Sequence, residues 1–402
     1  MRRYLQTLSR MLYLRSKPKP NMKPHINSMI TSTPQLKELQ PHERMQARVE
    51  KPIDDHQKSG KSEPKKTEYQ STFDQLFRSL TRTAYRPNNK VSIIGAGDTG
   101  MAAVFSLLTK GITNDISIID FNDEKLKGEL MDLQFGSKFL PNVRLRAGKD
   151  FAISSDSKIC VLAPCCTSVH DDENVDQVQV NAEVLKAVIP QLLKYSPNTI
   201  LLVAIDPVDM FSYLAWQISE LPKGRVIGTG TNLYTATFQY LLADRLGLSP
   251  SACHGYIIGE NGYSCVPVWS GVTAGGVHLQ RLNPDIGTEN DPENWAELHR
   301  QVLLGEQEVR DHKGGNSWAT ALSIADICAS VLYDKNCVRP LSTYVKGEYN
   351  INDEVFLSVP CVVGGAGVTD IVRLPLSPTE ITQLQRSADI IKIDQNRMKI
   401  VQ

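Results

Sequence analysis

Three glycines in residues 95–100 (GAGDTG) have the spacing of a loop that binds the phosphates of a dinucleotide. An apolar run precedes this loop and a helical pattern follows it, as such a loop requires. Gly95 permits the tight turn, Gly97 lets a pyrophosphate approach the backbone, and Gly100 lets the helix pack closely on the sheet. The amides at the start of the helix then face the phosphates.

Asp120 lies at the end of the next apolar run, twenty residues beyond Gly100. A carboxylate at this place accepts hydrogen bonds from both ribose hydroxyls of NAD and repels the 2′-phosphate of NADP. The glycines and Asp120 together predict an NAD site. The alternative interpretation is a glycine-rich turn that is kept only for packing.

Two other groups of reactive residues have weaker patterns. His170 precedes the acidic run 171–173 (DDE), but adjacent side chains rarely point at one ion, so a solvated acidic loop is favoured over a metal site. Cys165 and Cys166 are neighbours, and a disulfide between neighbours is strained, so free thiols are favoured over a redox device. The eight cysteines include no CxxC spacing. We therefore predict reduced thiols and no metal.

Apolar runs of strand length alternate with helical patterns from Asn89 onward. The strand-like runs lie at 90–94, 115–120, 158–163, 199–205 and 225–228, and the helical patterns lie at 101–108, from 124 onward and at 184–192. This alternation predicts an α/β fold with a doubly wound parallel sheet and right-handed crossovers. Near the end of the chain, Ser377 and Glu380 form a predicted capping box around Pro378, which begins a helix. Its predicted buried face is Ile381, Leu384, Ala388 and Ile391.

The beginning of the chain differs in composition from the rest. Residues 1–37 carry eight Lys or Arg and no Asp or Glu, and Leu5, Leu8 and Leu12 fall at helical spacing. This pattern is typical of a mitochondrial transit peptide, and the alternative is a disordered basic tail on a cytoplasmic protein. Frequent prolines and charges over 16–69 predict disorder, whereas an apolar stripe at 71–86 predicts a helix.

Composition argues against two kinds of partner. The formal net charge is zero, and once the basic beginning is set aside the remainder is acidic, so nucleic-acid binding is not expected. The longest apolar run, at 199–205, is far shorter than the roughly 18 residues that a membrane-spanning helix needs. We therefore expect no membrane partner.

Four longer segments resemble the L-lactate dehydrogenases almost word for word. They are DEKLKGELMDLQFGSKF (123–139), KYSPNTILLVAIDPVD (194–209), VPVWSG (266–271) and DEVFLSVPCVVG (353–364). The resemblance covers roughly residues 72–396 and implies a Rossmann-type, doubly wound parallel sheet followed by an α+β substrate domain. The implied division is a tail at 1–70, an oligomerisation arm at 71–89, a dinucleotide-binding domain at 90–231 and a substrate domain at 232–402. The arm implies a homo-oligomer, in this family a tetramer, or a hetero-oligomer with an active relative.

The positions that carry the family's chemistry hold other residues here. The family's proton-carrying His corresponds to Asn261 in the segment GENG (259–262). In the segment NLYTAT (232–237), Tyr234 replaces the Asp that orients the His, and Thr237 replaces the Arg that clamps the substrate carboxylate. Asn174 falls at the place of a second Arg, which polarises the substrate carbonyl from a loop. Asp206 replaces an Asn near the substrate and the nicotinamide.

These substitutions have physical consequences. An Asn amide does not titrate near neutral pH, and loss of a positioned acid–base group costs roughly 10²–10⁴ in rate. A Thr cannot form the two parallel hydrogen bonds of a guanidinium, and Asp206 adds negative charge where an anion would bind. Ser168 and Asn316 also replace residues of the family's substrate pocket. Near the dinucleotide, Pro164 removes an amide and Thr167 removes a basic contact, so we expect weakened NAD binding.

The sequence therefore favours a pseudoenzyme with no intact catalytic residue, which retains some NAD binding and acts as a structural or regulatory subunit. One alternative is an active NAD-dependent dehydrogenase with an altered substrate, such as a neutral carbonyl compound, in which Tyr234 and Asp206 form a new acid–base pair. A second alternative is a scaffold that binds no ligand.

Overall fold

The structure is a computed structural model that describes residues 89–164 and 177–397. Six of the described strands form a parallel sheet in which every pair of neighbours is parallel. They are β1 (Val91–Ile94), β2 (Asp115–Ile119), β3 (Arg144–Gly148), β4 (Ile159–Leu162), β5 (Ile200–Val203) and β6 (Val226–Gly228). Their order is β3-β2-β1-β4-β5-β6, so the direction of winding reverses between β1 and β4. The predicted doubly wound parallel sheet is confirmed.

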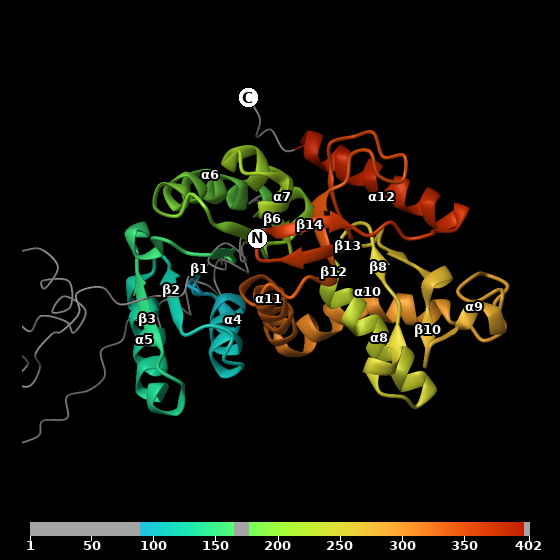
Figure 1. Cartoon of the computed structure of the whole chain (residues 1–402), viewed down its shortest axis with the longest axis horizontal. Helices are drawn as coiled ribbons and strands as arrows, with labels where there is room; N and C mark the ends of the chain where they lie inside the picture. The colour runs from blue at the N-terminus through green and yellow to red at the C-terminus, as the bar shows by residue number, and fades with distance from the viewer. Residues whose placement is uncertain (1–88, 165–176, 398–402) are drawn as a thin grey trace, which may run out of the picture. The chain divides into compact units, whose positions relative to one another are not determined.

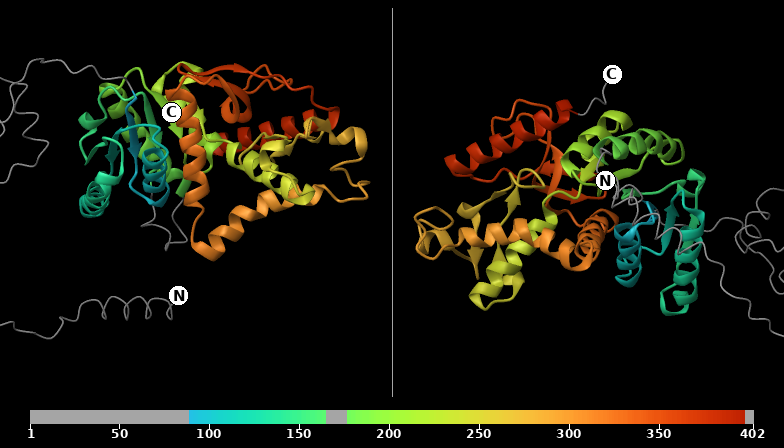
Figure 2. Two further views of the ribbon diagram at one scale, coloured as in Figure 1. Left: turned by 60° about the horizontal axis from the view of Figure 1, so that its bottom comes forward. Right: turned by 180° about the vertical axis from the view of Figure 1, so that it is seen from behind.

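Helices cover both faces of this sheet because successive strand side chains point to opposite sides. Val91 and Ile93 of β1 belong to one buried cluster, with side chains of α4 (Asp98–Thr109), α5 (Asp123–Phe135) and α11 (Ser317–Leu332). Ile94 belongs to a second cluster, with side chains of α6 (Gln177–Tyr195) and α7 (Val208–Ser219). Figure 1 shows α6 and α7 on one side of the parallel strands and α4 and α11 on the other, and the view from behind in Figure 2 shows the same arrangement.

Three antiparallel strands extend the sheet beyond β6, so that it has nine strands within the described residues. These strands are β12 (Cys337–Tyr344), β13 (Phe356–Gly364) and β14 (Gly367–Ile371). β12 joins β6 through the pairing of Ser342 with Gly228. The second half of the chain therefore shares a sheet with the first half.

The second half of the described chain mixes helices with short strands. Its further helices are α8 (Asn232–Leu246), α9 (Leu279–Leu282), α10 (Ala296–Lys313) and α12 (Pro378–Arg397). The short strands are β7 (Cys253–His254), β8 (Ile257–Ile258), β9 (Val266–Pro267), β10 (Thr273–Ala274) and β11 (Val277–His278). Phe238 of α8 packs edge-on against Trp269 in a third buried cluster. This mixture confirms the α+β character expected of the second half.

The predicted capping box of the last helix is present. The backbone amide of Ser377 donates to the Glu380 carboxylate at 2.7 Å, and the Glu380 amide donates to the Ser377 hydroxyl at 3.3 Å. The same carboxylate accepts bonds from the amide and hydroxyl of Ser270, which ties the start of α12 to the segment after β9. Leu384, Ala388 and Ile391 are buried as predicted, and Ile381 is half-buried.

Several predictions fall outside the described residues. They are the transit peptide, the disordered tail, the helix at 71–86, the acidic loop with His170, and the Cys165–Cys166 pair. All described residues belong to one compact unit, and the boundary between 231 and 232 lies inside it and stays a prediction. Within the described chain no helix combines the length and apolarity needed to cross a bilayer. The same residues contain no group of His, Cys, Asp and Glu that could hold a metal ion.

Candidate functional site

The predicted site residues gather at the carboxyl ends of the parallel strands. Gly95 follows β1 directly, Asp120 follows β2, and Asp206 lies in the loop between β5 and α7. In open α/β sheets ligands bind at this edge, next to the point where the strand order reverses. The order reverses between β1 and β4, which places the glycine loop at that point.

Two of the three loop glycines cannot be replaced by a residue with a side chain without movement of the backbone. Gly95 has a φ of +108°, and a Cβ there would lie 2.1 Å from the carbonyl oxygen of Ala163. A Cβ on Gly100 would lie 2.0 Å from the carbonyl oxygen of Gly95. The Gly95 amide donates to the carbonyl oxygen of Ile119 at 2.8 Å, which joins the turn to the end of β2. The crowding explains the glycine spacing and confirms the tight turn and the close helix packing predicted for Gly95 and Gly100.

The first turn of α4 offers backbone amides to an anion. Gly97 is the N-cap residue, and it has no side chain that could occupy those amides. Asp98 in the same turn is exposed and can point to solvent. Aligned peptide dipoles give a helix N-terminus a partial positive charge, so this turn suits a pyrophosphate.

Asp120 is held in place by two backbone amides. Its Oδ2 accepts a hydrogen bond from the Ala96 amide at 2.7 Å, and its Oδ1 accepts one from the Asn122 amide at 2.9 Å. Each carboxylate oxygen can accept a further bond. The carboxylate is therefore fixed beside the glycine loop with acceptor capacity left for ribose hydroxyls.

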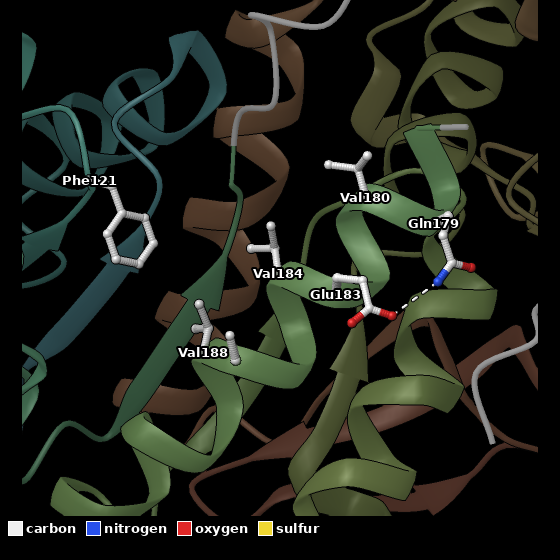
Figure 3. Close-up of a pocket in the computed structure, with 7 residues that line it drawn as sticks. Phe121, Gln179, Val180, Glu183, Val184 and Val188 are labelled. Carbon is white, nitrogen blue, oxygen red and sulfur yellow. Dashed lines mark hydrogen bonds between the residues drawn. The ribbon is translucent and has the colours of Figure 1, made fainter. Parts of the chain in front are cut away.

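An apolar cavity of about 430 Å³ is lined in part by Phe121, the residue after Asp120. Figure 3 shows Phe121 at the end of β2, facing α6 across the cavity, with Val180, Val184 and Val188 along the helix. Gln179 and Glu183 form a hydrogen bond of 3.0 Å at its edge, and Ala187 completes the lining. A cavity with these apolar walls fits a flat aromatic group. The sequence does not reveal this cavity, because the spacing in α6 predicts a helix without showing which of its side chains face Phe121.

The structure brings together two of the five predicted substrate positions. The Asn261 side-chain amide donates to Asp206 Oδ1 at 3.5 Å, and the Asn261 backbone amide donates to Asp209 Oδ2 at 2.7 Å. Tyr234 and Thr237 lie one turn apart on α8, but the Thr237 hydroxyl donates to the carbonyl oxygen of Leu233 at 3.0 Å. That hydroxyl is therefore used within its own helix. The fifth position, Asn174, lies outside the described residues.

Glu306 of α10, which no sequence pattern indicates, contacts the predicted site residue Tyr234. Its carboxylate accepts hydrogen bonds from the Tyr234 hydroxyl at 3.2 Å and from the Asn316 side chain at 2.9 Å. Arg310, one turn further along α10, forms an ion pair with the same carboxylate at 3.0 Å. The i,i+4 spacing of Glu306 and Arg310 predicts such a pair on any helix, but it does not indicate that the pair faces Tyr234.

Two carboxyl groups near Asn261 are electrostatically unfavourable when charged. Desolvation by the surrounding protein and the charge of Glu306 raise the pKa of Asp206 to about 6, although the residue keeps exposed surface and Arg310 opposes the shift. Asp209 is 1% exposed, and burial raises its pKa to about 7 despite bonds from Ser342 and the Asn261 amide. Burial and then Glu306 raise the pKa of the Tyr234 phenol far above its usual range. The site therefore disfavours added negative charge.

A thiol and an imidazole lie close together nearby. Cys265 Sγ is 3.3 Å from His299 Nε2. Burial raises the pKa of Cys265 to about 12 and lowers that of His299 to about 4. Both groups are therefore neutral at physiological pH, and the pair lacks the thiolate of a nucleophilic cysteine.

The strand order, the glycine turn and the carboxylate after β2 define a dinucleotide-binding protein of the Rossmann class. A family model described as "lactate/malate dehydrogenase, NAD binding domain" matches residues 89–228. A second, "lactate/malate dehydrogenase, alpha/beta C-terminal domain", matches residues 231–400. The chain belongs to the lactate/malate dehydrogenase family, as its resemblance predicted.

Curated relatives agree with this assignment. The chain is 47% identical over 305 residues to the L-lactate dehydrogenase A chain of Danio rerio, a match that covers 76% of this chain and 92% of the relative. It is 46% identical to the L-lactate dehydrogenase B chains of Bos taurus and of Homo sapiens, and each match covers 76% of this chain and 91% of the relative. The family relationship thus extends over both halves of the described structure.

Proposed function

We propose that this chain is a member of the family that binds NAD without turning over lactate, and that it acts as a structural or regulatory subunit. One observation carries the proposal: Asn261 stands in the proton-carrying position with its side chain next to Asp206, at 3.5 Å. Thr237 supports it, because its single hydroxyl is bonded to Leu233. At these positions the site has neither an imidazole for proton transfer nor a guanidinium for a carboxylate.

The described site fits NAD. The glycine turn and the start of α4 would hold the pyrophosphate, Asp120 would bind the ribose hydroxyls, and the cavity beside Phe121 would take the base. When bound, NAD supplies hydride-transfer chemistry. We propose weakened affinity because Pro164, at the end of β4, has no backbone amide to donate.

Calorimetric titration of the full chain with NADH and with NADPH tests this proposal. We expect NADH to bind in the micromolar range or more weakly, and NADPH to bind less tightly because of Asp120. The variant Asp120→Asn removes the charge and keeps a hydrogen-bond acceptor, so it should reduce the difference in affinity between NADH and NADPH. Absence of heat at millimolar NADH, or equal affinities for the two cofactors in the natural sequence, would contradict NAD binding.

A second candidate function is an oxidoreductase with an altered, uncharged substrate. The observation that favours it is the position of the Asp206 carboxylate, which is exposed and lies 3.5 Å from the Asn261 side chain. Its pKa is raised to about 6, and a carboxylate with a pKa near neutrality can act as a general base. The discriminating measurement is NADH oxidation with a set of neutral aldehydes and ketones at pH values on both sides of that pKa. Turnover that disappears in Asp206→Asn, with NADH binding retained, would favour this function over a pseudoenzyme.

We also propose that the chain forms a homo-oligomer or assembles with an active relative. Met131, Phe135 and Phe139 recur every four residues along α5 and the turn after it, and they are 40%, 76% and 88% exposed. Exposed apolar stripes of this kind mark protein interfaces. Light scattering on the purified full chain should report a mass above that of one chain. The control variant is Leu282→Glu, at an exposed apolar residue of α9, and it should not change the measured mass.

For the beginning of the chain we propose mitochondrial import, on the basis of its basic, acid-free sequence. A fluorescent reporter fused after residues 1–30 should accumulate in mitochondria. A matched fusion in which Arg2, Arg3 and Arg10 are replaced by Glu should stay diffuse. A diffuse signal from the natural segment would contradict the proposal and favour a cytoplasmic location.

A further inference from the structure

The carboxylate of Glu306 accepts hydrogen bonds from three surrounding side chains. Tyr234 donates to its Oε2 at 3.2 Å, and Asn316 and Arg310 donate to its Oε1 at 2.9 and 3.0 Å. The Glu306 side chain is only 22% exposed, so three bonds hold it against protein rather than in open solvent. Tyr234 and Asn316 are also positions that the family resemblance assigns to the substrate pocket. An internal carboxylate is therefore bound by residues at positions expected to face a ligand.

Glu306 and Arg310 lie within electrostatic reach of the exposed end of the site. Glu306 raises the pKa of Asp206, and Arg310 lowers it. Asp206 in turn contacts Asn261. The bonds of Glu306 to Tyr234 and Asn316 place the ion pair of α10 at positions that the family resemblance assigns to the substrate pocket. Its charges act electrostatically on Asp206.

We propose that Glu306 determines the ligand specificity of this site by excluding carboxylates. It does so in two ways: its charge repels an anion beside Asp206, and it occupies Arg310, which could otherwise bind an incoming carboxylate. The ligands that the site accepts are uncharged molecules that donate hydrogen bonds to Asp206. This inference rests on the proposed function, because it places the ligand beside bound NAD.

The variant Glu306→Gln separates charge from shape. The single oxygen of glutamine can still accept the bond from Asn316, and its NH2 group then takes the place of the oxygen that accepts from Tyr234. The ion pair with Arg310 is lost. Arg310 then becomes available to an anion, and a charge-assisted bond of this kind changes affinity by roughly ten- to hundredfold. Glu308→Gln is the matched control, because Glu308 lies on the exposed surface of the same helix and loses the same charge.

The test is calorimetric titration of the full chain with oxamate, a carboxylate that resembles a 2-oxo acid and does not react, in the presence and absence of NADH. We expect weak or undetectable binding to the natural sequence and to Glu308→Gln. We expect at least about a tenfold gain in Glu306→Gln, and loss of that gain in the double variant Glu306→Gln/Arg310→Gln. Thermal unfolding of each variant verifies that it is folded.

Three outcomes would overturn the inference. They are unchanged oxamate affinity in folded Glu306→Gln, an equal gain in Glu308→Gln, and a gain that survives in the double variant. The titration without NADH keeps these outcomes separate from failure of the proposed function. If NADH does not bind, the proposed function fails, whereas the oxamate comparison still decides the role of Glu306.

Discussion

Replacing Asn261 by His alone should not create a lactate dehydrogenase. The introduced imidazole would lie beside the Asp206 carboxylate, because the Asn261 side chain lies 3.5 Å from it. Tyr234 stands in place of the family's orienting Asp and donates a hydrogen bond to Glu306 at 3.2 Å. It therefore offers the imidazole no carboxylate. A substrate carboxylate would still lack its clamp, since the Thr237 hydroxyl is bonded to Leu233.

The size of the deficit follows from these contacts. A missing acid–base group costs roughly 10²–10⁴ in rate. Two missing charge-assisted hydrogen bonds cost about 1.5–3 kcal/mol each, or roughly 10²–10⁴ together in affinity. Groups in one catalytic unit are not additive, so the two factors cannot simply be multiplied. We expect the natural sequence to reduce pyruvate at least about four orders of magnitude more slowly than an active relative. Asn261→His alone restores the imidazole without its orienting carboxylate or the substrate clamp, so we expect it not to recover that activity.

A combined variant should recover measurable turnover, and the assay is pyruvate-dependent loss of NADH absorbance. Its substitutions are Asn174→Arg, Asp206→Asn, Tyr234→Asp, Thr237→Arg and Asn261→His. Glu306 lies beside position 234, where it accepts a hydrogen bond from Tyr234 at 3.2 Å, and it would repel an aspartate introduced there. Adding Glu306→Gln should therefore increase turnover further. If Asn261→His alone were as active as the combined variant, the reasoning from the orienting and clamping positions would be refuted.

Three further predictions concern the cofactor turn, the buried acid and the apolar stripe. Gly100→Ala should abolish NADH binding and cost about 1–3 kcal/mol of stability, because its Cβ would lie 2.0 Å from the carbonyl oxygen of Gly95. The control is Gly128→Ala in α5, which should leave NADH binding intact because no atom lies within 4 Å of its Cβ. The folded-state pKa of Asp209, raised to about 7 from 3.8, means that its contribution to stability is fully present below about pH 4 and is lost as the pH rises through about 7. Chemical denaturation at several pH values should show this decline, and Asp209→Asn should flatten it. Phe135→Glu/Phe139→Glu should reduce the mass measured by light scattering, and an unchanged mass would remove the stripe from the interface.

Strongly patterned elements could be predicted from the sequence, although their ends could not. The run at 199–205 is a strand only over Ile200–Val203, since Ile205 and Asp206 already belong to the loop that reaches the site. The capping box at Ser377 and Glu380 depends only on local spacing, and its two bonds are present. β3 was missed because it is an edge strand with exposed or half-buried residues, and its two arginines interrupt any apolar run.

Some residues of the candidate site could likewise be predicted from the sequence, whereas its long-range contacts could not. The places of Gly95, Gly100 and Asp120 could be predicted because the spacing of one strand–helix–strand unit puts them after β1, in α4 and after β2. The contact between Asn261 and Asp206 joins residues 55 positions apart, and only the family resemblance placed them near each other. Glu306 lies 72 positions from Tyr234, and nothing in the helical pattern of α10 identifies the face that meets α8. Long-range packing sets this contact, so it could be found only in the structure.

The most direct test of the central claim is to saturate the purified natural protein with NADH and then add pyruvate while following NADH absorbance. Our proposal predicts saturable NADH binding and no pyruvate-dependent loss of absorbance above the background rate. Brisk oxidation of NADH on addition of pyruvate would contradict the claim that the substitutions at Asn261, Tyr234 and Thr237 abolish lactate chemistry.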